Sequence, residues 1–138
     1  MELLMRVRGW AWLSVLALVL LVPGRIATAD DPEFEVADPD GVYYGTGKNP
    51  KNPGVMTADD VWKEIPEYKE IVDEELTDDD PKWHLLMAKA TERFNKALKK
   101  LAQRDSYDML GEVGAIVAKG KKTIPDVTKE MIKLVTRD

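Results

Sequence analysis

The chain has 138 residues, no cysteine and a formal net charge of −5 at pH 7. Without a thiol it has no disulfide, no thiolate metal site and no haem attached through cysteine, and its acidic balance argues against a nucleic-acid partner. Residues 30–81 hold 17 acidic and 4 basic side chains, whereas residues 82–138 hold 7 acidic and 13 basic. This asymmetry fits oppositely charged elements packed side by side, head-to-tail contacts between subunits, or simply two solvated faces.

Residues 1–29 have the three parts of a secretory signal peptide: a short positive start, an apolar run and a small-residue cleavage site. The apolar run, residues 10–22, is too short for a comfortable membrane span. Ala27 and Ala29 occupy the positions that a signal peptidase reads, so we expect cleavage before Asp30. The alternative is an uncleaved N-terminal anchor. Cleavage predicts an exported chain with no stable membrane span, placed in the periplasm or, alternatively, secreted from the cell.

Residues 30–54 are rich in Asp, Pro, Gly and Asn, and few of their side chains can fill a core. This composition predicts a flexible acidic arm. The exception is the Val-Tyr-Tyr segment 42–44, which is a candidate short strand or docking patch. We therefore place a single folded domain at residues 55–138.

A helical hairpin is predicted over residues 57–104. Thr57 is a suitable N-cap for its first helix, and Pro66 should kink or divide that helix. The turn after it, residues 77–81, contains three aspartates, but it lacks the spaced ligands of a calcium-binding loop. The apolar stripe of the first helix recurs at helical spacing and consists of Val61, Ile65, Tyr68, Val72 and Leu76.

The second helix of the hairpin, residues 82–104, carries the clearest pattern in the chain. Apolar residues follow a heptad spacing at Trp83, Met87, Ala90, Phe94, Ala97 and Leu101. Five side chains are the candidates for hairpin packing or for contact with a bound protein: Trp83, Leu86, Met87, Phe94 and Leu98. The alternative is that most of them simply form the core of the hairpin.

After residue 104 the helical period ends. Two short strands are expected within residues 107–118, followed by a basic loop containing Lys119, Lys121 and Lys122. These lysines fit an anionic lipid or an acidic partner, or they are simply solvated. A final amphipathic helix is expected over residues 127–136. Together the elements predict an α+β fold, in which an antiparallel helical hairpin lies on a small antiparallel sheet with a C-terminal helix.

No group of residues in the sequence has the spacing of an active site. His84 is the single histidine, and no metal-binding or acid–base motif surrounds it. Ser106 is the one serine after the signal peptide, and it lacks the context of a catalytic nucleophile. We therefore expect no enzyme activity, no metal and no cofactor.

The C-terminal part of the chain resembles the OmpH/Skp family of periplasmic chaperones. The resemblance lies in Tyr-Asp-Met-Leu at 107–110, Gly-Ala-Ile-Val at 114–117 and the stretch 125–134, which starts Pro-Asp-Val-Thr and ends in paired aliphatic residues. Residues 61–69 are also similar to the first helix of that family, which commonly carries a proline near this point. The similar region covers roughly residues 55–135.

The resemblance implies an exported homotrimer. In that family a β-rich head joins the subunits, and a helical hairpin from each subunit surrounds unfolded outer-membrane proteins without catalysis. This chain differs in having a far shorter hairpin, whose first arm and tip are acidic where the family's are basic. Two hypotheses follow: a holdase chaperone that binds unfolded or outer-membrane proteins, and an oligomeric envelope scaffold or adaptor that keeps only the head.

Overall fold

The computed structural model describes residues 31–137, so the expected signal peptide and cleavage site (Ala27, Ala29 and Asp30) lie outside the described residues. Helices and strands are mixed along the chain, which confirms the α+β class. The elements in chain order are β1 (Phe34–Val36), the 3-10 turn η1 (Pro39–Gly41), β2 (Val42–Tyr44), β3 (Pro53–Met56), α1 (Ala58–Trp62), α2 (Pro66–Asp73), α3 (Pro81–Asp105), β4 (Met109–Glu112), β5 (Ile116–Ala118) and α4 (Thr128–Arg137).

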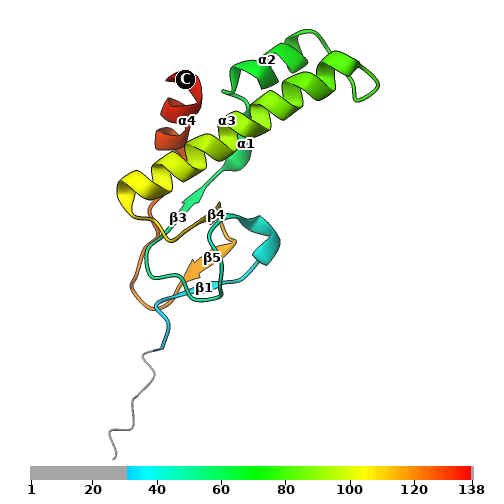
Figure 1. Cartoon of the computed structure of the whole chain (residues 1–138). Helices are drawn as coiled ribbons and strands as arrows, with labels where there is room; N and C mark the ends of the chain where they lie inside the picture. The colour runs from blue at the N-terminus through cyan, green and yellow to red at the C-terminus, as the bar shows by residue number, and fades with distance from the viewer. Residues whose placement is uncertain (1–30, 138) are drawn as a thin grey trace, which may run out of the picture. The chain divides into compact units, whose positions relative to one another are not determined.

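The strands form two small sheets below the helices (Figure 1). In the three-stranded sheet, β4 lies between β2 and β3, and it runs antiparallel to β2 but parallel to β3. The prediction of a purely antiparallel sheet is therefore wrong for this pair. The reason is that α1, α2 and α3 all lie between β3 and β4, and such a crossover returns the chain in the same direction. The second sheet pairs β1 with β5 in antiparallel register.

Residues 31–54 do not form the flexible arm that composition predicts. They contain β1, η1, β2 and the start of β3, and they belong to the same compact unit as the helices. The candidate strand at 42–44 is confirmed as β2. The segment is ordered because β1 pairs with β5 and β2 pairs with β4. A segment with few apolar side chains can still form edge strands, since these are held by backbone hydrogen bonds to a neighbouring strand.

The first helix of the hairpin is divided at Pro66, as expected. α1 ends at Trp62, and α2 starts with Pro66 as its first residue. Thr57 precedes α1 but makes no side-chain capping bond. The Glu112 carboxylate caps α1 instead, accepting a hydrogen bond from the Ala58 amide at 3.0 Å, so a strand distant in sequence supplies the cap.

α3 spans Pro81–Asp105 and is the longest element, with α2 packed along its first half and α4 along its second (Figure 1). Asp80 precedes this helix without a side-chain capping bond, Pro81 is its first residue, and Ser106 ends it in a left-handed conformation with φ 58°. At 1.5 Å per residue α3 is roughly 37 Å long. It forms the antiparallel hairpin with α2 and is the common wall against which the other helices pack.

The main core lies where α3 meets α1, α4 and the sheet. Its members are apolar and almost fully buried; they include Met56, Val61, Ile65, Ala90, Phe94, Leu98, Leu101, Leu110, Met131 and Val135. A second, smaller cluster lies between the two sheets and consists of Phe34, Val55, Met109 and Ile116. The second cluster takes Phe34 from the segment expected to be irregular.

Candidate functional site

The helical hairpin is the candidate site, and the five side chains selected from the sequence divide into two groups within it. Leu86, Phe94 and Leu98 are buried, with 6%, 4% and 2% of their surfaces exposed. Trp83 and Met87 are only half-buried. The buried three therefore act in packing, and the other two remain accessible near the turn of the hairpin.

Phe94 holds the first part of the chain against α3. Its ring stacks on Trp62 at a centroid distance of 5.0 Å and meets the edge of Tyr43 at 5.8 Å. Trp62 also contacts Tyr68 edge-to-face at 5.9 Å. Aromatic pairs in these geometries add about 0.5–1.5 kcal/mol each beyond the area they bury. Phe94 is thus a packing residue that joins α3 to α1 and to β2.

Apolar side chains that the core does not cover lie close to the turn of the hairpin. Val72 in α2 is 58% exposed, and Leu85 in α3 is 56% exposed. The sequence predicts Val72 on the apolar stripe of the first helix, but in the structure Val72 is exposed and Ile71 is the buried residue of α2. The division at Pro66 interrupts the helix, so the spacing counted from α1 does not carry over into α2.

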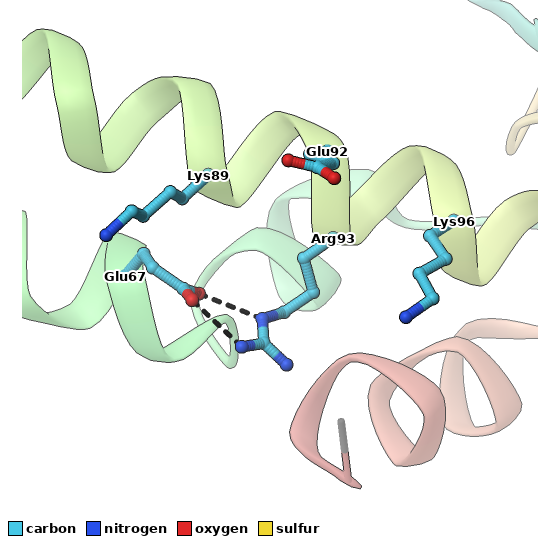
Figure 2. Close-up of a pocket in the computed structure, with 5 residues that line it drawn as sticks. All are labelled: Glu67, Lys89, Glu92, Arg93 and Lys96. Carbon is cyan, nitrogen blue, oxygen red and sulfur yellow. Dashed lines mark hydrogen bonds and ion pairs between the residues drawn. The ribbon is translucent and has the colours of Figure 1, made fainter.

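An ion pair joins the two helices of the hairpin (Figure 2). Glu67 of α2 accepts two hydrogen bonds from Arg93 of α3, at 2.9 Å from Nε and 2.8 Å from Nη2. The Nη1 atom of Arg93 also donates to the backbone oxygen of Val135 in α4 at 3.5 Å. The bidentate bond from Arg93 holds the pKa of Glu67 below its ordinary value. One arginine therefore links three helices.

A second ion-pair cluster lies nearer the turn. Lys82 contacts Glu70 at 2.8 Å and Glu74 at 2.6 Å. These carboxylates raise the pKa of Lys82, chiefly through hydrogen bonds. The acidic helix α2 is thus paired with the basic helix α3 of the same chain. Of the three explanations for the uneven charge, this one is oppositely charged elements packed side by side.

The basic loop after β5 also finds its partners within the chain. Lys119 contacts Glu35 at 3.0 Å, and Lys122 contacts Glu33 at 3.2 Å. All four side chains are about half exposed, so each pair contributes little stability. The loop faces the N-terminal strand rather than standing apart as a separate basic patch.

The remaining polar candidates do not come together into a site. His84 is exposed on α3, and its ring lies edge-on to Trp83 at 5.0 Å. Ser106 is the residue that ends α3. Over residues 31–137, no group of three or more His, Asp or Glu side chains is arranged to hold a metal ion.

Two groups of side-chain contacts could not be predicted from the local sequence. Glu67 and Arg93 are 26 residues apart, and nothing in either helix alone marks them as partners. Glu112 accepts hydrogen bonds from the Tyr43 hydroxyl at 2.9 Å and from the Ala58 amide. Glu112 thus joins β4, β2 and α1, and its acidic side chain in an otherwise apolar strand was the one signal available in the sequence.

No protein-family model, curated protein or solved structure matches this chain. Among residues 31–137, no helix has the length and apolar character needed to cross a membrane.

Proposed function

We propose that this chain is an exported, Skp-like holdase that binds apolar segments of unfolded proteins, outer-membrane proteins among them, at the outer half of its hairpin. The observation that carries the proposal is the exposure of two apolar side chains of the hairpin, Val72 of α2 and Leu85 of α3. Trp83 and Met87 of α3 are half-buried. In this proposal these side chains belong to an exposed apolar surface of the kind that binds other chains. The mechanism needs no catalysis and no cofactor, only transient burial of client surface.

The signal-like residues 1–29 support the exported location. In this proposal the chain is released at Asp30 and acts in the periplasm or outside the cell. Assembly into a homo-oligomer, a trimer by resemblance to the OmpH/Skp family, would bring several short hairpins together. Several weak apolar sites on one particle bind an extended chain more tightly than one site does.

A scaffold or adaptor without client binding is the second candidate. It is favoured by the burial of Leu86, Phe94 and Leu98 in the hairpin's own core. It is also favoured by the ion pairs of Lys82 and Arg93, which engage the glutamates of α2 within the chain. In that case the hairpin serves the fold, and the protein assembles without affinity for unfolded proteins.

The test is light scattering during refolding of a β-barrel client, with and without the protein at stoichiometric amounts. We expect wild type to suppress aggregation and the double variant Val72→Ser, Leu85→Ser to lose most of this effect. Val113→Ser is the matched control, because Val113 is equally exposed (53%) but lies between β4 and β5. No suppression by wild type would refute the holdase and leave the scaffold. If Val113→Ser alone abolished the suppression of aggregation, the client-binding surface would lie on the sheets rather than on the hairpin.

Sedimentation equilibrium tests assembly separately. We expect a defined oligomer, and a molar mass of three chains would agree with the family resemblance. A monomer at micromolar concentration would count against both candidate functions, whatever the scattering experiment gives.

A further inference from the structure

The outer side of α3, in the second half of the helix, carries a group of exposed lysines. A shallow hollow there is lined by Lys96, Lys99, Lys100 and Gln103. Lys96 and Lys99 also line a neighbouring hollow, in which Glu92 is the one acidic side chain. These side chains therefore lie together on one surface, and we call the four that line the first hollow the lysine face.

Two lysines of this face have no carboxylate partner in the part of the chain that the structure describes. Over residues 31–137, neither Lys96 nor Lys99 forms an ion pair. Figure 2 shows the amine of Lys96 apart from the Glu67–Arg93 pair. The lysine face thus differs from Lys82 of the same helix, which pairs with glutamates of α2.

The opposite charge is exposed where the two helices of the hairpin meet. Four acidic side chains, which we call the acidic turn, are exposed and form no ion pair with another residue of 31–137. They are Asp73, Glu75, Asp78 and Asp79. Lys82, the first cation after the turn, is already paired with Glu70 and Glu74. The acidic turn therefore keeps its charge.

The length of α3 separates the two surfaces within one chain. The acidic turn lies at the start of α3 (Figure 1), and Lys99 lies 18 residues after Pro81, the first residue of that helix. At 1.5 Å per residue this is roughly 27 Å along the axis, several times the reach of an ion pair and beyond the screening distance of about 8 Å at physiological salt. The lysine face and the acidic turn can neutralise each other only between two chains.

From this arrangement of charge we propose that the lysine face of one chain docks the acidic turn of a second copy. The contact repeats between chains the kind of pairing that α2 and α3 already make within one chain. It is head-to-tail, because each chain offers its face to one neighbour and its turn to another. Such contacts close into a ring or grow into a filament, depending on the rotation between copies. The inference rests on the self-assembly in the proposed function and is independent of client binding.

The test is a charge swap followed by sedimentation equilibrium of the full chain. Lys96→Glu with Lys99→Glu reverses the lysine face, and Asp73→Lys with Asp78→Lys reverses the acidic turn. Each double variant should lower the molar mass at least twofold relative to wild type, because like charges then meet across the contact. A chain with all four substitutions should regain the wild-type mass, since both signs are exchanged.

Lys48→Glu with Lys121→Glu is the matched control. Both lysines are exposed, lie outside α3 and form no ion pair among residues 31–137. The control therefore changes the net charge as much as reversal of the lysine face does, and it should leave the mass unchanged. Added salt should lower the mass of wild type, because exposed charges are screened more strongly as ionic strength rises.

The proposal is wrong if either reversed variant keeps the wild-type mass while its helical circular dichroism signal is intact. In that case the chains assemble through another surface, and the holdase still stands or falls by the scattering experiment. An equal loss of mass in the control, or no recovery in the chain with four substitutions, would also overturn it. Should a reversed variant lose its helical signal, the neutral pair Lys96→Gln, Lys99→Gln replaces it and should lower the mass as well.

Discussion

The two halves of α3 lie in different surroundings although one heptad pattern runs through both. From Ala90 onwards the helix buries six side chains against α1, α4 and the sheet, whereas before Ala90 it buries Leu86 alone. The first half is held by α2 and by the exposed pairs of Lys82. A continuous apolar stripe thus predicts a helix but does not say how much of it a core will cover. The four predictions that follow test this difference, starting with the largest effect.

Truncation of Phe94, in the well-packed second half, should cost the most stability. Phe94→Ala removes a ring that is 4% exposed and stacked on Trp62, and such changes cost about 3–5 kcal/mol. Met87→Ala, in the half-buried first half, should cost about 1 kcal/mol or less. Urea unfolding followed by circular dichroism measures both. Equal losses would mean that the two halves are equally well packed.

The Glu67–Arg93 pair marks the boundary between the halves, and breaking it should have an intermediate effect. Both side chains are about one-fifth exposed, so Arg93→Met leaves a partly buried carboxylate without its partner. We expect a loss of about 1–3 kcal/mol. A double-mutant cycle with Glu67→Gln isolates the coupling between the two side chains. A coupling near zero would show that Arg93 acts only through its contact with α4.

The same pair sets a dependence on acid. Arg93 lowers the pKa of Glu67 from its ordinary 4.5, so the folded state binds fewer protons at this group than the unfolded state does. The stabilisation is present above pH 4.5 and is lost as the pH falls below it. Glu67→Gln should flatten this part of the stability–pH curve. A curve as steep as that of wild type would assign the acid sensitivity to other carboxylates, such as Asp126, whose pKa is lowered by hydrogen bonds from Thr128.

The smallest effect is expected at Tyr43, which meets the second half from β2. Burial raises the pKa of its hydroxyl to about 12, with a further contribution from the hydrogen bond to Glu112. The folded state therefore holds this proton more tightly, so its stabilisation is complete below pH 10 and is lost between pH 10 and 12. Tyr43→Phe should remove this alkaline component. Absorbance titration of the tyrosines, which follows ionisation directly, provides the measurement.

The helices were largely predictable because their signals are local. The heptad spacing marked α3, Pro66 marked the division between α1 and α2, and the Pro-Asp-Val-Thr sequence marked the start of α4. Local spacing could not predict that Val72 is exposed, because the helix is interrupted before Pro66 and the apolar spacing of α1 does not continue into α2. It also could not pair Glu67 with Arg93, since each residue looks like an ordinary surface charge within its own helix.

The strands were less predictable for a different reason. β1 and β2 have three residues each and lie in a segment whose composition is that of a loop. The Val-Tyr-Tyr run indicated β2, but no such run marked β1. Both are ordered by pairing with strands that lie 66 to 84 residues later in the chain. The resemblance to the OmpH/Skp family began at residue 55, so it offered no guide to them either.

The pairing of β1 with β5 also imposes an order in time. Phe34 lies opposite Ala118, so a chain made from its N-terminus completes the whole hairpin before β1 has a partner. Contacts between residues so far apart in sequence form slowly, because the intervening chain must first be brought together. The N-terminal strand is therefore among the earliest parts of the protein to be synthesised and among the last to find its place.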